Sequence, residues 1–139
     1  MTDCIFCKII TGELPSERVY EDEVVLAFLD IAPVNPGHTL LIPKAHVSDL
    51  LTVDPADMAR LVQALPKVAR AVVEGTKAEG FNASFNNGAA AGQIVWHLHC
   101  HIIPRFASDG YRSWGHRAYV EGEAAAVADK IRAALAGQG

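Results

Sequence analysis

The feature that most constrains the fold is a short run of alternating histidines and apolar residues, "HLHCHII", at residues 97–103. Side chains two residues apart point to the same face of a β-strand, whereas in an α-helix they diverge. The alternation therefore predicts a strand over residues 94–105 with His97, His99 and His101 on one face. Each imidazole is expensive to bury without a polar partner, so a purely structural row of three is disfavoured. We expect this face to be catalytic or metal-binding.

The segments before this run predict further short elements. A helical turn is expected at the N-terminus, capped by Asp3 and ended by Gly12. A hairpin is expected around residues 21–23, a third strand from Thr39, and a fourth strand over residues 81–86. Because short turns join several of these strands, we expect the sheet to be antiparallel.

Two long helices complete the predicted architecture. Asp54 is a good N-cap and Pro55 suits the first helical position, while Gly80 is expected to end this first helix. Pro66 lies inside it and is expected to kink it. A second amphipathic helix is expected over residues 123–136. The predicted class is α+β: a five-stranded antiparallel sheet with one long central helix and a C-terminal helix.

Composition favours a globular protein of the cytoplasm. The 139 residues are 50% apolar and 20% charged, which suits a single domain with a real core. A net charge of −4 provides no basic surface for nucleic acid, and no apolar run is long enough to span a membrane. The three cysteines are an odd number and no signal-like segment precedes them, so we expect no disulfide framework and a cytoplasmic location.

Cys4 and Cys7 have the spacing of half a metal site. Two cysteines do not complete a tetrahedral set, so the residues alone leave metal binding and ordinary packing open. A redox pair is disfavoured, because such a pair usually follows a strand and no strand is predicted before Cys4.

The segments around the histidines resemble the histidine-triad family of nucleotide hydrolases and transferases. The run "HLHCHII" is similar to that family's alternation of histidines and apolar residues. The segments "CIFCKIITGELPSERVYEDE", "AFLDIAPVNPGHTLLIPKAH" and "NNGAAAGQIVWHLHCHIIPR" also resemble the family, in the family's order. The resemblance is strongest to bacterial adenosine-phosphoramidate hydrolases. It implies one histidine-triad domain over residues 1–139, with a core at 4–105 and an extension at 106–139.

The resemblance implies a reaction at the α-phosphate of adenosine or other purine nucleotides, through a covalent nucleotidyl-His99 intermediate. Nucleoside phosphoramidate hydrolysis, which releases AMP, is the expected activity. By the same resemblance, His101 donates to a phosphate oxygen and His38 helps to set the tautomers. The backbone carbonyl of His97 holds the Nδ1 proton of His99. Neutral imidazole is a good nucleophile near pH 7, which agrees with this assignment.

A nucleotide pocket is also implied by the resemblance. Asn86 and Gln93 match positions that contact phosphate or the leaving group, and Asp30 matches an acceptor for ribose hydroxyls. The residues that match an apolar base pocket are Phe6, Phe28, Leu29 and Ile31. From the residues alone, Asn86 is equally well a turn residue, Asp30 a strand-end cap, and the apolar side chains plain core.

Several bacterial members bind a structural zinc ion, and the matching residues here are Cys4, Cys7, His46 and His97. Such a Cys₂His₂ set is closed to water, so the resemblance implies a structural metal and no catalytic one. The family usually forms a two-fold homodimer in which two five-stranded sheets join, and a homodimer is expected here.

One position departs from the family pattern. Ile94 stands where relatives often carry a serine or threonine that hydrogen-bonds the leaving group, and isoleucine supplies no hydroxyl. Three hypotheses stay open. The first is a metal-independent hydrolase that uses His99, acting on phosphoramidates or on diadenosine polyphosphates. The second is a metalloenzyme whose three clustered histidines hold one metal, and the third is a nucleotide-binding or scaffolding protein with little turnover.

Overall fold

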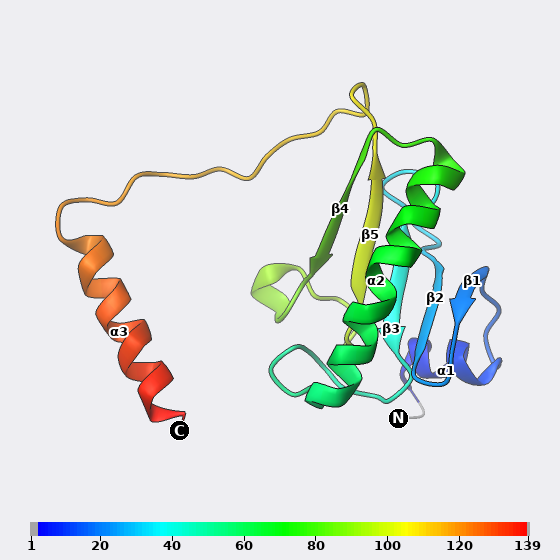
Figure 1. Cartoon of the computed structure of the whole chain (residues 1–139), viewed down its shortest axis with the longest axis horizontal. Helices are drawn as coiled ribbons and strands as arrows, with labels where there is room; N and C mark the ends of the chain where they lie inside the picture. Colours follow the sequence, from blue (N-terminus) through cyan, green and yellow to red (C-terminus); the bar gives the residue numbers. More distant parts are fainter. Residues whose placement is uncertain (1–2, 139) are drawn as a thin grey trace.

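The computed structural model describes residues 3–138 and contains one five-stranded antiparallel sheet with helices packed on both faces (Figure 1). The strands are β1 (Arg18–Glu21), β2 (Val25–Leu29), β3 (Thr39–Pro43), β4 (Gly80–Phe85) and β5 (Cys100–Arg105). They lie in the order β1-β2-β3-β5-β4, so that β1 and β4 are the two edges. The predicted α+β class and antiparallel sheet are confirmed.

The central helix α2 (Pro55–Thr76) covers one face of the sheet. The side chain of Asp54 accepts the backbone N–H of Ala56 and so caps the helix as predicted. The helix ends at Thr76, with Lys77 in the left-handed conformation, whereas the sequence predicted an end at Gly80, which instead begins β4. The helix continues through Pro66. The core between helix and sheet contains Val25, Ala27, Leu41, Leu61, Ala64, Val68, Ala69, Val72, Cys100 and Ile102.

The short helix α1 (Ile5–Thr11) lies on the opposite face. Its N-cap is Cys4, whose sulfur accepts the N–H of Cys7; the prediction that Asp3 caps this turn was wrong. Gly12 ends the helix with a φ of 84°, as predicted. The buried cluster beneath α1 consists of Phe6, Leu26, Phe28, Leu40 and Ile42. Helix α1 thus brings two cysteines and one aromatic ring to the face that carries the histidines.

Strand β5 is shorter than predicted. It begins at Cys100 rather than at Ile94, so that His97 and His99 lie before the strand and only His101 belongs to it. His101 pairs with Leu40 of β3 and Ser84 of β4. The alternation within β5 holds: Cys100 and Ile102 face α2, and His101 faces the other side.

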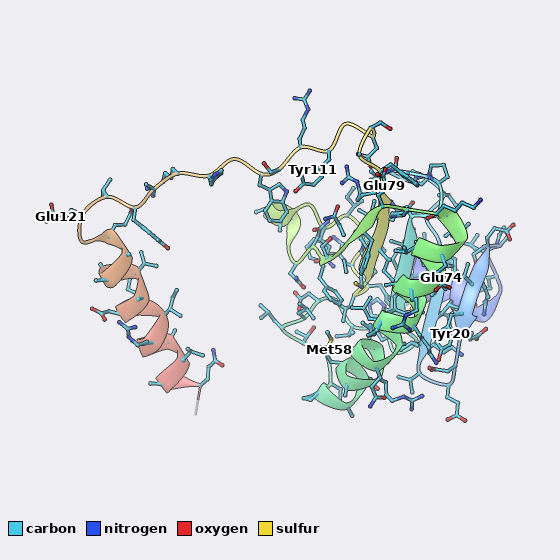
Figure 2. The ribbon with its side chains drawn as sticks, turned by 45° about the horizontal axis from the view of Figure 1, so that its top comes forward. Tyr20, Met58, Glu74, Glu79, Tyr111 and Glu121 are labelled. Carbon is cyan, nitrogen blue, oxygen red and sulfur yellow. The ribbon has the colours of Figure 1, made fainter. Side chains whose placement is uncertain are left out.

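Residues 110–138 form a C-terminal arm that leaves the sheet (Figure 1). An irregular segment leads to helix α3 (Glu123–Gly137), which buries no residue. Figure 2 shows Tyr111 beside the sheet and Glu121 at the far end of the extended segment. Within residues 3–138, no helix has the length and apolar character that crossing a membrane requires.

Candidate active site and metal centre

A cavity of about 760 Å³ opens on the α1 side of the sheet, within the size range of small-molecule sites, about 300–1,000 Å³. His99 and His101 lie in its wall. Six of the predicted substrate-binding residues line it as well: Phe6, Phe28, Leu29, Asp30, Ile31 and Asn86. The predicted catalytic and substrate-binding residues, which are far apart in the sequence, therefore line one cavity.

The floor of the cavity is aromatic and apolar. The rings of Phe6 and Phe28 meet edge to face with centroids 5.4 Å apart, and Phe6 stands edge-on to His99 at 5.1 Å. Ile31 is 97% exposed and contributes only to the rim. The sequence interpretation missed several apolar wall residues: Ile5, Ile9, Leu14, Leu40 and Val95. Ile9 follows Phe6 by three residues on one helix, and this spacing places both side chains on the same face, so Ile9 could have been predicted as a wall residue.

The imidazole of His99 has a fixed tautomer. Its Nδ1 lies 2.7 Å from the backbone carbonyl oxygen of His97. A carbonyl oxygen can only accept, so Nδ1 carries the proton and Nε2 keeps its lone pair. His99 is 8% exposed and lines the cavity, so this lone pair belongs to a group at the cavity wall.

A relay of hydrogen bonds fixes the tautomer of His101. The backbone N–H of Val34 donates to Nδ1 of His38 at 3.0 Å, so neutral His38 carries its proton on Nε2. That Nε2–H donates to Nδ1 of His101 at 2.9 Å. His101 therefore carries its own proton on Nε2, where it is a donor at the cavity wall. At the cavity wall, His99 thus offers a lone pair on Nε2, and the adjacent His101 offers a proton on Nε2.

Burial keeps both relay histidines neutral. It lowers the pKa of His101 to about 4, and the nearby His99 and His38 act in the same direction. Burial also lowers the pKa of His38, while the carboxylate of Asp30, 3.7 Å from its Nε2, opposes the shift. Near pH 7 each ring therefore has one proton and one lone pair, which the relay requires.

The turn that carries His38 depends on Gly37. Its φ of 99° is rarely adopted by residues with a side chain. A Cβ at this position would lie 2.5 Å from Cγ2 of Thr76, at the end of α2. The close approach of α2 to this turn therefore helps to place His38 against His101.

Gln93 lies in the loop before β5. This residue is buried and does not line the cavity. Its Oε1 accepts the N–H of Gly88, and its Nε2 donates to the carbonyls of Ser48 and Val95. With both ends of its amide engaged, Gln93 holds the loop in shape rather than facing a phosphate. Ile94 lies at the cavity edge and is 85% exposed.

A second cluster joins Cys4, Cys7, His46 and His97, whose ligand atoms all lie within 4.8 Å of one another. Nδ1 of His97 is 3.4 Å from Sγ of Cys4 and 3.7 Å from Sγ of Cys7, and Nδ1 of His46 is 3.4 Å from Sγ of Cys7. A tetrahedral zinc ion with Zn–S near 2.3 Å and Zn–N near 2.0 Å separates its ligands by about 3.3–3.8 Å. The spacing therefore fits a zinc site.

The tautomer of His97 also suits a ligand. Its Nε2 lies 2.8 Å from the carbonyl oxygen of Pro43, so Nε2 carries the proton and the lone pair of Nδ1 faces the two sulfurs. Burial lowers the pKa of His97, which keeps the ring in the neutral form that binds metal. The donor set can hold a metal without any of the cavity histidines.

The geometry disfavours a catalytic metal held by the three clustered histidines. Within residues 3–138, His97, His99 and His101 do not form a group with converging ligand atoms. Asp30, His38 and His101 do lie within 4.8 Å of one another. However, Nδ1 of His38 accepts an N–H, so its Nε2 holds a proton and has no lone pair for a metal.

The fold and the site together define an α+β protein whose sheet presents a network of neutral histidines to a small-molecule cavity. The HIT domain model matches residues 11–108. Protein hit of Bacillus subtilis is 50% identical over 110 residues, which are 78% of this chain and 76% of that protein. The chain belongs to the histidine-triad (HIT) family.

A further relative and two solved structures are also similar to this chain. Adenylylsulfatase HINT3 of Arabidopsis thaliana is 46% identical over 107 residues, 77% of this chain and 54% of that protein. The crystal structure of SMU.412c from Streptococcus mutans UA159 has a TM-score of 0.91 and 45% identity, covering 97% of this chain and 87% of that one. A zinc-bound histidine triad family protein from Mycobacterium smegmatis has a TM-score of 0.74 and 39% identity, covering 95% and 98%. The family thus includes a nucleotide hydrolase and a zinc-bound member.

Proposed function

We propose that this protein hydrolyses adenosine nucleotides at the α-phosphate through a covalent nucleotidyl-His99 intermediate. The observation that carries the proposal is the 2.7 Å contact between Nδ1 of His99 and the carbonyl oxygen of His97. It leaves the Nε2 lone pair of a neutral imidazole at the wall of the cavity. A neutral, oriented imidazole is a competent nucleophile near pH 7.

In the first step, Nε2 of His99 forms a bond to the α-phosphorus, and the bond between phosphorus and the leaving group breaks. The leaving group departs with the electron pair of that bond and takes a proton from solvent when it needs one. The adduct is an imidazolium, whose positive charge the carbonyl of His97 stabilises through Nδ1–H. The Nε2–H of His101 donates to a phosphate oxygen as charge grows there.

In the second step, water attacks phosphorus and the N–P bond breaks. The products are AMP and neutral His99, and the water proton is released to solvent. Phosphoryl transfer depends mostly on positioning and on donors to the phosphate oxygens. The relay from Val34 through His38 keeps the proton of His101 on the nitrogen that donates in both steps.

The cavity supports a purine nucleotide as the substrate. The edge-to-face pair of Phe6 and Phe28 provides an apolar seat for a base, with Leu29 beside it and Ile31 at the rim. Asp30 retains an oxygen, Oδ2, that does not bind the backbone and can accept a ribose hydroxyl. Asn86 lies where its amide can donate to the phosphate or to the leaving group.

Phosphoramidates are the proposed substrates, with diadenosine polyphosphates as the alternative. The test is AMP release from AMP-lysine, AMP-amide, diadenosine polyphosphates and adenylyl sulfate, measured on the wild type. We expect turnover of the phosphoramidates. Turnover restricted to the polyphosphates or to adenylyl sulfate would replace the proposed substrate class. AMP binding without turnover of any compound would instead support the nucleotide-binding alternative, for which the exposed Ile94 is the supporting observation.

We further propose that Cys4, Cys7, His46 and His97 hold a structural zinc ion. When bound, the ion supplies a cross-link between the N-terminal turn and the chain just before β5. His97 would then be held at two points, the metal and Pro43, and its carbonyl would be fixed for His99. Metal analysis of protein purified without added zinc tests this, with about one ion per chain expected.

A homodimer is the proposed assembly, and the two sheet edges differ in a way that supports it. β1 has four residues, a register irregularity and the charged pair Arg18 and Glu21, all of which protect an edge from pairing. β4 has six residues, no charge and no proline, and the side chain of Phe81 is 45% exposed. A second β4 can therefore add to this edge and continue the sheet.

A further inference from the structure

The loop before β3 is tied to the C-terminal end of β5 by the side chain of Asn35. Its Nδ2 donates to the backbone carbonyl of Pro104 and to Oδ2 of Asp109, each at 2.8 Å. The regular ladder between β3 and β5 stops at the pair of Thr39 and Ile102. Pro104 lies two residues further along β5, so the amide of Asn35 takes the place of a strand N–H there. Figure 1 shows the loop before β3 and the C-terminal end of β5 at the same end of the sheet.

Asp109 is a fixed acceptor for this amide. Its carboxylate binds the guanidinium of Arg105 through two hydrogen bonds of 2.9 Å and also accepts the backbone N–H of Phe106 at 2.9 Å. The side chain of Asp109 is only 7% exposed, and the hydrogen bonds from Arg105 hold its pKa well below the usual range. Hydrogen bonds to an ionised group are shorter and stronger than neutral ones. Asn35 is therefore anchored to a well-held point of β5.

Asn35 is also the first residue of the turn that presents His38. Its backbone carbonyl accepts the N–H of His38 at 3.0 Å. Pro36 and Gly37 fill the two central positions, and a proline followed by a glycine with a positive φ is typical of a type II turn. One residue before the turn, the N–H of Val34 donates to Nδ1 of His38 at 3.0 Å. The anchored residue and the first donor of the relay are therefore adjacent in the chain.

Val34 has little packing of its own to orient its backbone. It is 57% exposed, and Ala32 and Pro33 before it are exposed as well. The N–H of Ala32 binds Asp30 and holds the start of the loop, but Pro33 has no N–H to extend this hold. On the other side, Asn35 precedes a proline, which restricts it to extended conformations. The direction of the Val34 N–H therefore depends on the anchor of Asn35.

The relay between His38 and His101 has two possible directions. In the first, Nε2 of His38 donates to Nδ1 of His101, and His101 presents its own Nε2–H to the cavity. In the second, Nδ1 of His101 donates to Nε2 of His38, and His101 presents a lone pair to the cavity instead. Both directions keep the 2.9 Å contact between the two rings, so this contact alone does not select one of them.

The N–H of Val34 selects the first direction. In the second direction His38 would carry its proton on Nδ1, facing the N–H of Val34, and two donors that face one another at a buried ring are unfavourable. The carboxylate of Asp30 also favours a proton on Nε2 of His38, but at 3.7 Å it is too far away for a hydrogen bond. The Val34 N–H is thus the group in direct contact with the ring that determines its tautomer.

We propose that Asn35 and Asp109 are positioning residues for the proposed reaction. They hold the N–H of Val34 on Nδ1 of His38 and thereby keep the proton of His101 on the nitrogen at the cavity. Neither Asn35 nor Asp109 lines the cavity. Their effect on turnover rests on the proposed function of His101, whereas their effect on the tautomers does not.

Nitrogen NMR of histidine-labelled protein near neutral pH tests the tautomers without reference to activity. In the wild type we expect a protonated Nε2 and an unprotonated Nδ1 for His101, whose signals are assigned by their loss in His101→Gln. Asn35→Ala should move this proton to Nδ1 in a measurable fraction of molecules. Wild-type tautomers in Asn35→Ala, or a wild-type His101 that is already protonated on Nδ1, would overturn the proposal.

Two further variants make the NMR test specific. Asp109→Ala removes one of the two acceptors of the Asn35 amide, so it should shift the same proton by a smaller fraction, and it serves the test if Asn35→Ala does not fold. Asn82→Ala is the matched control, because Asn82 accepts the same Arg105 guanidinium at 3.0 Å from β4 and not from the loop. It should leave the tautomer of His101 unchanged. A shift of equal size in the Asn82 variant would show a general loosening of the sheet and refute the specific role.

Turnover tests whether the anchor acts through His101. Asn35→Ala should lower kcat about tenfold, less than the roughly 10²-fold loss expected from removal of the donor itself. KM should stay within about twofold of the wild type, because no cavity residue changes. In the His101→Ala protein the same substitution should cause no further loss, since the group that Asn35 positions is absent. An equal loss in both backgrounds would contradict an action through His101.

The two readouts separate this proposal from the proposed function. A protein that releases no AMP, but whose His101 proton shifts in Asn35→Ala and not in Asn82→Ala, would support the positioning role and refute the proposed reaction. An active enzyme whose tautomers are unchanged in both Asn35→Ala and Asp109→Ala would support the reaction and refute the positioning role.

Discussion

His97 and His99 are two residues apart and chemically identical, yet the structure gives them opposite tautomers. Nε2 of His97 donates to the carbonyl of Pro43, so its Nδ1 lone pair faces the sulfurs of Cys4 and Cys7. Nδ1 of His99 donates to the carbonyl of His97, so its Nε2 lone pair is at the cavity. The choice of ring nitrogen bound by a backbone carbonyl therefore separates a metal-binding region from a nucleophilic region within one short run.

The largest expected effect comes from the nucleophilic region. His99→Ala removes the attacking nitrogen and should lower kcat by about 10⁶-fold, as loss of a covalent nucleophile does in other enzymes. The metal content should stay at the wild-type value, because His99 is not among the four cluster residues. Steady-state kinetics and metal analysis of one preparation measure both. Glu74→Ala, at an exposed position of α2 outside the cavity and the metal cluster, is the control and should keep wild-type turnover.

His101→Ala should have the next largest effect. It removes the Nε2–H that we propose donates to the phosphate, and loss of one such donor costs about 10²-fold in kcat. His101→Gln retains an N–H donor and should recover part of this loss. If Ala and Gln at this position gave equal rates, the proposed donor role of His101 would be wrong.

The same residue should give the protein a pH-dependent stability. Burial lowers the pKa of His101 to about 4, whereas its ordinary value is 6.5. Between these two values the unfolded chain binds the proton and the folded protein does not, so the free energy of unfolding rises with pH. Urea unfolding at pH 5 and pH 7 should show a smaller difference for His101→Gln than for the wild type. An unchanged difference would contradict the buried, neutral state.

Changes in the metal region should act on stability more than on chemistry. The double substitution Cys4→Ser and Cys7→Ser should abolish zinc binding and lower the free energy of unfolding by about 3 kcal/mol or more. Turnover of folded protein should fall less than tenfold, since the carbonyl of His97 remains. Cys100→Ala, in the core behind the histidines, should destabilise the fold but retain zinc. A variant that lost zinc and all activity while still folded would contradict the separation between a metal region that stabilises the fold and a nucleophilic region that performs the chemistry.

The smallest expected effect is at Ile94, on the leaving-group side of the nucleophile. Ile94→Ser introduces a hydroxyl that can assist an amine, so turnover of AMP-lysine should rise about three- to tenfold. Adenylyl sulfate should show little change, because sulfate leaves as a stable anion without a proton. The ratio of the two rates measures the effect, and an equal gain on both substrates would show that the substitution acts through loop structure.

The positions of the histidines illustrate what could be predicted from the sequence. Alternation placed His101 on one face of a strand and Cys100 on the other, because β geometry is local. The start of β5 was not predictable in the same way. His97 is fixed by Pro43, 54 residues away, and the N–H of Leu98 donates to Val47. These long-range contacts take residues 97–99 out of the regular ladder.

In the loop before β5 and at the helix ends, too, local features were predictable from the sequence and long-range contacts were not. The side-chain amide of Gln93 binds Gly88 and Ser48, and no local sequence pattern reveals these two contacts. The C-terminal end of α2 depends on Lys77 adopting a left-handed conformation with a φ of 58°, which is uncommon for lysine. Cys4 rather than Asp3 caps α1, because its sulfur faces the N–H of Cys7. Helix α3 was predicted by its periodicity, but its distance from the sheet was not.

The central claim is that His99 is a covalent nucleophile that works without a metal on the cavity side. Rapid acid-free quenching of single turnovers, followed by peptide mass analysis, tests it most directly on zinc-loaded and zinc-depleted folded protein. We expect one adenylyl group on the peptide that contains His99 in both preparations and none in His99→Ala. An adduct absent from both wild-type preparations during turnover, or found on another residue, would contradict the account.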